Sequence, residues 1–232
     1  MTTIADRLTA VHERIRAACE RSGRDPVAVT LVAVAKTFPA DAVVAALDAG
    51  ATDIGENRAQ ELKEKAAVIG RAVRWHFVGH LQSNKVRQVV GVASLIHSVD
   101  RYGVGEAIAR RASSLDITQD VLIEVNLAGE ASKTGVEPAR AGALAEEVAA
   151  LEGVRVRGVM ALPPLTDDPE AARPHLRALA ELGGEIAARV EGATEVSMGM
   201  TRDLEVAVEE GATLVRVGEA IFGPRNPARR SR

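Results

Sequence analysis

The sequence predicts an α/β protein built as a single-domain (β/α)8 barrel of the TIM type, preceded by an additional N-terminal helix. Short β-branched runs alternate with longer helical patterns, which is typical of a parallel sheet. Eight such runs fit within 232 residues, near the lower size limit of the closed barrel. The chief rival is an open doubly wound sheet, but no run carries its G-x-G-x-x-G fingerprint, and GVGEAI at 103–108 fails at its last position.

The first element is expected to be a helix within residues 1–24. Its apolar residues recur at helical spacing, at Ile4, Leu8, Val11, Ile15 and Ala18. Thr2 or Thr3 can cap its start, and Gly23 can end it in the left-handed conformation. We expect Cys19 to be an ordinary small residue of this helix.

The eight strand-like runs share β-branched residues and turn residues at their ends. They are VTLVAVAK (29–36), TDIGEN (52–57), RWHFVG (74–79), SLIHSV (94–99), DVLIEVNL (120–127), VRVRGVMAL (154–162), TEVSMG (194–199) and TLVRVG (213–218). The helical patterns between them include residues 39–50, 58–70, 137–153, 169–192 and 201–211, each of which ends in Gly. No linker or change of composition interrupts the sequence, so residues 1–232 are expected to form a single domain. The basic segment 224–232 is expected to be a flexible tail.

Composition excludes several classes of function. The net charge of −3 gives no general reason to bind nucleic acid or anionic lipid. A single cysteine excludes an intrachain disulfide and fits a reducing compartment. No apolar run is long enough to span a bilayer, and the N-terminus lacks the apolar core of a signal peptide. We therefore expect a cytoplasmic protein.

The strand ends define the candidate site, because the active site of such a barrel lies at the carboxyl ends of its strands. Small or polar residues stand at nearly all of these ends: Lys36, Asn57, Gly79 with His80, Ser98 with Asp100, Asn126, Met160, Ser197 with Gly199, and Arg216 with Gly218.

Lys36 ends an apolar strand and shares a face with Val32 and Val34. Partial desolvation would favour its neutral amine, the form that attacks an aldehyde to make a Schiff base. The alternative is a strand-end lysine that extends to water. Lys85 and Lys133 lie near the same rim and are rivals, whereas Lys63 and Lys65 are expected on a solvated helix face.

Two segments after the last strands favour an anion site. In SMGMTRD (197–203), Ser197 and Thr201 offer hydroxyls, Gly199 allows close approach of a ligand, and Thr201 is expected to be the N-cap of the next helix. GEAIFG (218–223) follows the eighth strand, and the loops after strands seven and eight commonly bind phosphate. Ordinary capping with a glycine turn is the alternative, and the side chains of Met198 and Met200 are expected to pack.

Arg216 lies between apolar neighbours and needs a partner. This partner is either a carboxylate, such as Glu56, Glu124 or Glu219, or an acceptor atom of a ligand.

The histidines favour no metal site, because His76 and His80 share no helix face. His80 is expected at the rim, and His97 is expected to be structural.

Seven motifs in this order, AVAKTFP, DIGENRAQEL, WHFVGHLQSNK, IHSVDR, RGVMALPP, SMGMTRD and RVGEAIFG, resemble the YggS/PROSC family of pyridoxal phosphate (PLP) homeostasis proteins. The resemblance runs from about Val29 to Gly223. It implies a barrel similar to the N-terminal domain of bacterial alanine racemase.

The resemblance also implies roles for individual residues. Lys36 would form a Schiff base with PLP, and Arg216 would face the pyridine nitrogen. The phosphate would be held by Ser197, Thr201 and the backbone around Met198, Gly199, Gly218 and Glu219. Asn57 and His80 would line the pocket near the ring. Thr201 stands where serine is common in the family, and Ala59 is a further mild variation.

The function implied is reversible binding of PLP for buffering and for supply to apo-enzymes, by a monomer or weak dimer without robust catalysis of its own. The first alternative is a PLP-dependent amino-acid racemase. Such an enzyme needs a second acid/base, and the only tyrosine here is Tyr102, after the fourth strand. A weaker alternative is a PLP-free Schiff-base or sugar-phosphate barrel enzyme.

Overall fold

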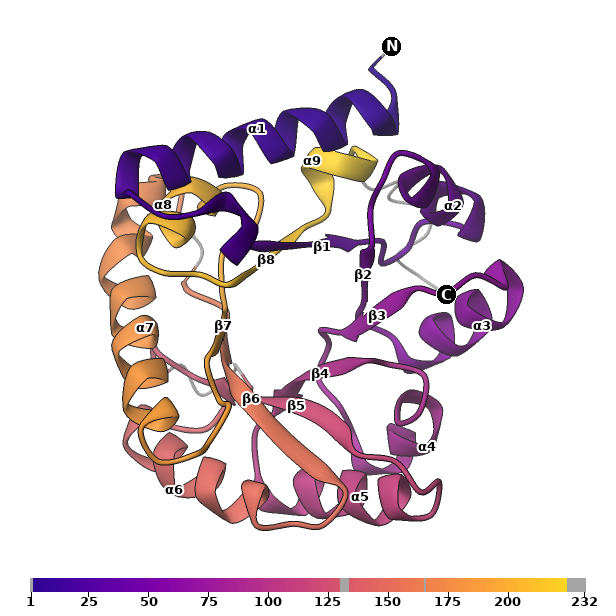
Figure 1. The fold of residues 1–232 in the computed structure, drawn as a ribbon, viewed down its shortest axis with the longest axis vertical. Coiled ribbons are helices and arrows are strands. Elements are labelled where there is room, and N and C mark those ends of the chain that lie inside the picture. Colours follow the sequence, from indigo (N-terminus) through magenta and orange to yellow (C-terminus); the bar gives the residue numbers. More distant parts are fainter. Residues whose placement is uncertain (1, 130–133, 165, 225–232) are drawn as a thin grey trace.

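The computed structural model describes residues 2–129, 134–164 and 166–224. Its eight strands pair in parallel in chain order, and β8 pairs with β1, so the barrel is closed as predicted (Figure 1). The strands are β1 (Thr30–Val34), β2 (Asp53–Glu56), β3 (Arg74–Phe77), β4 (Leu95–Val99), β5 (Gln119–Val125), β6 (Val154–Ala161), β7 (Glu195–Ser197) and β8 (Leu214–Val217).

Helices surround the ring of strands. They are α1 (Ile4–Ser22), α2 (Ala40–Asp48), α3 (Ala59–Ile69), α4 (Val86–Val89), α5 (Tyr102–Ser113), α6 (Pro138–Ala149), α7 (Arg173–Ala187), α8 (Leu204–Glu209) and α9 (Glu219–Phe222). Short 3-10 turns occupy Pro26–Ala28, Ser83–Lys85 and Pro169–Ala172. Helix α5 is absent from the helical patterns read from the sequence, and part of 169–192 is a 3-10 turn.

The N-terminal helix is confirmed with its predicted ends. The Thr3 hydroxyl accepts the Asp6 N–H, the Asp6 carboxylate accepts the Thr3 N–H, and Gly23 adopts a left-handed φ of 67°. Cys19 is buried, as expected of a small helix residue, and burial raises the pKa of its thiol. Figure 1 shows α1 lying across α8 and α9, outside the ring.

The strand faces separate two apolar clusters. The larger one lies between the strands and the helices and includes Leu31, Ala33 and Ile54. The smaller one fills the interior of the barrel and consists of Val32, Val34, Leu95, Leu122, Met160 and Leu214. Successive residues of a strand point to opposite faces, so this division identifies which side chains face inward.

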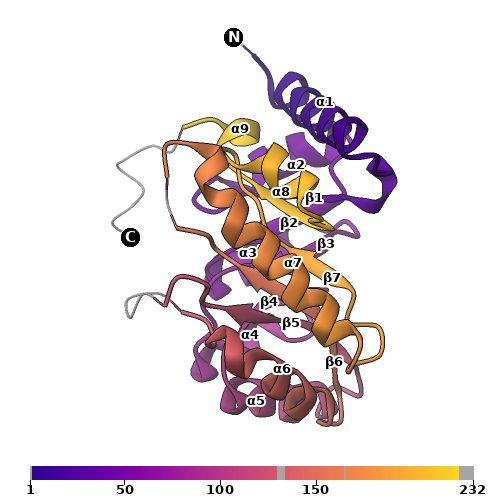
Figure 2. The same ribbon diagram turned by 90° about the vertical axis from the view of Figure 1, so that its left-hand side faces the viewer.

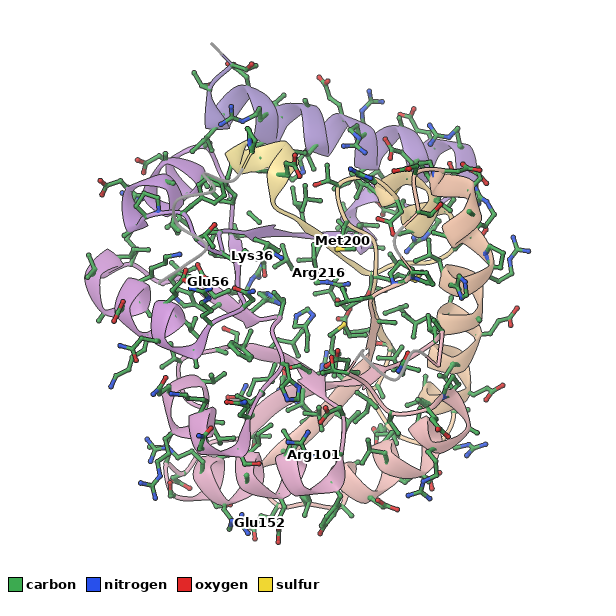
Figure 3. The ribbon with its side chains drawn as sticks, turned by 180° about the vertical axis from the view of Figure 1, so that it is seen from behind. Lys36, Glu56, Arg101, Glu152, Met200 and Arg216 are labelled. Atoms are coloured by element: carbon green, nitrogen blue, oxygen red, sulfur yellow. The ribbon has the colours of Figure 1, made fainter. Side chains whose placement is uncertain are left out.

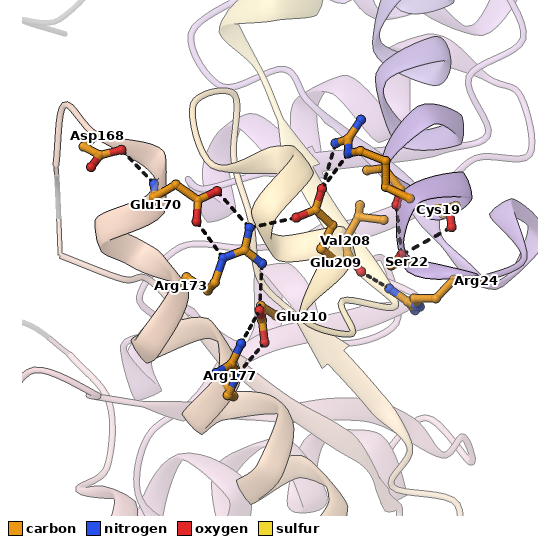
Figure 4. Close-up of polar contacts among 12 residues, drawn as sticks. Cys19, Ser22, Arg24, Asp168, Glu170, Arg173, Arg177, Val208, Glu209 and Glu210 are labelled. Carbon is orange, nitrogen blue, oxygen red and sulfur yellow. Dashed lines mark hydrogen bonds and ion pairs between the residues drawn. The ribbon is translucent and has the colours of Figure 1, made fainter.

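Charged side chains join neighbouring helices on the outside. Figure 2 shows α7 alongside β7 and α8, and Figure 4 shows Arg173 of α7 between three carboxylates. Its guanidinium lies 2.7–2.8 Å from Glu170, Glu209 and Glu210. Glu209 also pairs with Arg21 of α1 at 2.8 Å. Such networks contribute more than isolated surface pairs.

Candidate functional site at the barrel mouth

Lys36 lies two residues beyond the end of β1, in a turn, whereas the sequence predicts the strand to continue to residue 36. It keeps the predicted register, because Val32 and Val34 on the same face belong to the interior cluster. Its side chain is half-buried. Figure 3 shows Lys36 and Arg216 near the centre of the barrel, over β1 and β8.

Both peptide groups that flank Lys36 are held by α3. The Lys65 ammonium donates to the Ala35 carbonyl at 3.0 Å, and the Thr37 N–H donates to the Glu61 carboxylate at 3.0 Å. Thr37 adopts a φ of 69°, a left-handed conformation that costs a β-branched residue energy. These two contacts therefore stabilise the turn that presents the lysine.

The expectation that Lys65 is solvated is wrong, while Lys63 is exposed as expected. Lys65 is buried because Glu56, at the end of β2, faces α3 and pairs with it at 2.6 Å. Burial raises the pKa of Glu56 to about 7, and the charge and hydrogen bond of Lys65 oppose that rise. The sequence spacing from Glu61 to Lys65 gives no sign of this second, long-range partner.

Arg216 is buried in the interior and makes two hydrogen bonds. It donates to the Ser197 hydroxyl at 2.5 Å and to the Ala161 carbonyl at 2.9 Å. Both acceptors are uncharged, so neither of these two hydrogen bonds goes to one of the carboxylates that the sequence offered as an alternative. Burial lowers the pKa of Arg216 to about 10, so the guanidinium keeps its charge near neutral pH. A buried cation held by neutral groups attracts an electron-rich ligand.

Ser197 is fully buried at the end of β7. Its hydroxyl contacts Arg216 and also the ring of His97, whose Nδ1 lies at 2.9 Å. His97 is fully buried, which agrees with its expected structural role. The hydroxyl of Ser197 is therefore engaged with protein groups on two sides.

The segment after β7 turns before the next helix begins. Helix α8 starts at Leu204 with Asp203 as its N-cap, so the expectation that Thr201 caps this helix is wrong. The Asp203 carboxylate accepts the Met200 N–H at 2.7 Å, which closes the turn. Thr201 is thereby left half-buried at the mouth, while Met198 is fully buried in the outer cluster.

The fold itself requires glycine at position 199 and leaves little room for a side chain at Gly218. Gly199 has a φ of 87°, and a Cβ there would lie 2.4 Å from the Ala207 Cβ of α8. A Cβ on Gly218 would lie 3.0 Å from the Val34 carbonyl oxygen. These contacts bring α8, and Glu219 at the start of α9, close to the mouth. Glu219 itself is exposed.

Asn57 and His80 lie on the β2 and β3 side of the mouth. Within the described ranges, Asn57 Oδ1 is buried without a hydrogen-bond partner. His80 is more exposed, and its Nδ1 lies 3.5 Å from Asp100.

Glu124 of β5 is a further residue of this region, which the sequence suggested only as a possible carboxylate partner of Arg216. It is buried, and this burial raises the pKa of its carboxyl. The alternation with Leu122 could have identified it, because both share the interior face.

Other features bear on the class of site. The part of the chain that the structure describes contains no cluster of three His, Cys, Asp or Glu residues able to hold a metal ion. None of its helices is long and apolar enough to cross a membrane. A surface hollow of about 420 Å³, lined by Arg155 and Arg189 among others, lies at the opposite end of the barrel from Lys36.

The fold and site define a (β/α)8-barrel protein with an amine, a buried guanidinium and a tight turn at one mouth. The chain belongs to the family described as "Alanine racemase, N-terminal domain", whose pattern matches residues 7–226. This match confirms the fold expected from the motifs.

Two curated relatives are named pyridoxal phosphate homeostasis protein. The relative from Aquifex aeolicus is 45% identical over 222 residues, which cover 95% of this chain and 97% of the relative. The relative from Pseudomonas aeruginosa is 42% identical over 227 residues, covering 97% of each chain. Among solved structures, PipY of Synechococcus elongatus with PLP bound is 33% identical, with a TM-score of 0.79 over 92% of this chain and all of PipY. The resemblance drawn from the motifs is confirmed.

Proposed function

We propose that this protein binds PLP covalently through Lys36 and serves in the storage and supply of that cofactor, without catalysing racemisation. The observation that carries the proposal is the pairing, at one mouth, of a half-buried amine with a buried guanidinium whose acceptors are neutral. The names of the relatives and the PLP held by PipY support the same function.

The residues present fit this cofactor. Lys36 would hold the cofactor, since its amine can condense reversibly with an aldehyde, with water as the leaving group. The Asn57 Oδ1, buried without a partner among the described residues, is suited to accept from a polar group at the ring. His80 lines the more exposed edge.

For the phosphate, the Thr201 hydroxyl and the backbone around Gly199, Gly218 and Glu219 are suitable donors. The Met198 N–H already donates to the Leu214 carbonyl, so Met198 contributes by packing. A role of Ser197 in phosphate binding stays a prediction, and its hydrogen bond to Arg216 gives it a second way to support the site.

Arg216 faces the pyridine nitrogen in this proposal. The bound cofactor supplies an electron-withdrawing ring, and a positive group beside the nitrogen opposes its protonation and weakens that property. A racemase also needs an acid/base on the second face of its substrate. Tyr102, the only tyrosine, is 44% exposed at the start of α5. No contact in the described residues favours the racemase.

Supply to apo-enzymes follows from the same chemistry, because a C=N bond to one amine exchanges with another. We accordingly propose that the partners are PLP and apo PLP-dependent enzymes. We further propose that the protein is a cytoplasmic monomer or weak dimer.

The test compares two lysines at the mouth. Lys36→Met should abolish the visible absorption band that forms when the protein is mixed with PLP, while Lys85→Met, on the exposed 3-10 turn after β3, should leave it unchanged. Circular dichroism checks that both variants fold. Retention of the band in Lys36→Met, or its loss in Lys85→Met, contradicts the proposal.

A further inference from the structure

Five buried side chains form a continuous hydrogen-bonded chain through the barrel interior, here called the interior chain: Asp53, His76, His97, Ser197 and Arg216. Each is at most 5% exposed. His76 Nε2 lies 2.9 Å from Asp53 Oδ1, and His76 Nδ1 lies 2.9 Å from His97 Nε2. His97 Nδ1 then contacts the Ser197 hydroxyl, which accepts from Arg216. The members come from β2, β3, β4, β7 and β8.

The two ends of the interior chain determine where each proton lies. A guanidinium only donates, and an ionised carboxylate only accepts. Asp53 is ionised: burial would raise the pKa of its carboxyl, but hydrogen bonds from His76, Arg74 and Thr52 outweigh burial and hold it well below its usual value. His76 therefore carries its proton on Nε2.

The remaining protons follow if both rings are neutral. His76 Nδ1 must accept, so His97 donates from Nε2. His97 Nδ1 must then accept, so Ser197 donates its hydroxyl proton there and uses its oxygen to accept from Arg216. Burial, together with the charge of Arg216, lowers the pKa of His97 far below its usual value. Every hydrogen bond of the interior chain then has one donor and one acceptor. All of them are donated in the same direction, from Arg216 toward Asp53.

The surroundings favour this neutral state. Asp53 already has an external cation, since Arg74 lies 2.6 Å from its Oδ2. At the other end, the nearby carboxylates of Asp203 and Glu124 favour the charge on Arg216. A protonated histidine between these two ends of the interior chain would be a further buried cation, without an anion of its own.

We infer that Asp53 is a positioning residue for Arg216. Through the interior chain it fixes His76 and His97 as neutral Nε2–H tautomers, directs the Ser197 hydroxyl away from the guanidinium, and so leaves the Ser197 oxygen free to hold Arg216 at the mouth. The same arrangement precludes a hydrolase-like use of Ser197, because its hydroxyl is buried and its oxygen is occupied by Arg216. The effect on cofactor binding rests on the proposed function, whereas the tautomers do not.

The first test is made on the full-length protein without PLP. At mildly alkaline pH, two-bond ¹H–¹⁵N correlation spectra should show His76 and His97 as neutral rings protonated on Nε2, with the exposed ring of His12 as a reference. A proton on Nδ1 of either ring overturns the inference. This test needs no variant to fold.

The second test uses Asp53→Leu, which keeps a similar side-chain shape but removes the anion and both acceptor oxygens. Both histidines should lose the single tautomer, and the dissociation constant for PLP should rise about tenfold, the effect of losing one buried hydrogen bond. Arg155→Met is the control, because it removes an exposed ion pair with Asp120 that lies outside the interior chain, and it should change neither readout. Unchanged tautomers, or changed tautomers with unchanged affinity, overturn the inference. A wild-type protein that binds no PLP contradicts the proposed function instead.

Discussion

Lys36 shows how one side chain is placed by contacts beyond its own strand. Alternation along residues 30–36 correctly predicts the interior face, because period two is a local property of a strand. It does not predict the turn at Thr37, whose φ of 69° depends on Glu61 and Lys65 of α3. The position of the lysine could therefore be predicted from the sequence, but its support could not.

Glu56 gives a pH-dependent prediction at the same scale. Its pKa is raised from 4.5 to about 7 in the folded protein, chiefly by burial. Between these pH values the folded state holds a proton that the unfolded chain has lost, so the unfolding free energy falls as pH rises from about 4.5 to 7. Because the side chain of the Glu56→Gln variant cannot ionise, this variant should lose up to about 3 kcal/mol of the decrease in unfolding free energy. Urea unfolding at each pH measures this difference.

Glu64→Gln, on the exposed face of α3, is the matched control and should keep the wild-type pH dependence. Parallel pH profiles for the wild type and Glu56→Gln would show that the folded state holds no such proton.

At the scale of elements, α1 is attached to the segments around the mouth by arginines that donate to backbone carbonyls. Arg7 donates to Ile221 of α9 at 2.6 Å, and Arg14 donates to Thr201 at 2.8 Å. Arg14 also binds both carboxylate oxygens of Glu205 in α8. The helix thus supports both segments that are proposed to hold the phosphate. Sequence periodicity predicted this helix but gave no sign of its contacts.

We expect Arg14→Met to weaken PLP binding about fivefold, because the Thr201 turn loses a charge-assisted hydrogen bond. The position of the visible band should not move, since Lys36 is untouched. Equilibrium dialysis against PLP measures the affinity. Arg16→Met, which removes an exposed pair with Glu20 on the same helix, is the control and should bind as the wild type does. Equal affinity in the two variants would mean that α1 does not support the phosphate segment.

At the scale of the whole molecule, the closed barrel was predictable because strand and helix periodicities recur along the chain. Helix α5 was not predicted, although Val104, Ile108 and Ala112 are buried at helical spacing in it. The interior chain could not be predicted either, because its five members come from five strands and meet only through barrel closure. His76 and Asp53 carry no local signal of their contact.

The central claim is that Lys36 is the residue that captures PLP. Borohydride reduction of the PLP-loaded protein, followed by peptide mass spectrometry, tests this claim most directly. We predict a single pyridoxyl-phosphate adduct on Lys36. An adduct on Lys85 or Lys133 in its place, or no adduct at all, would contradict the account.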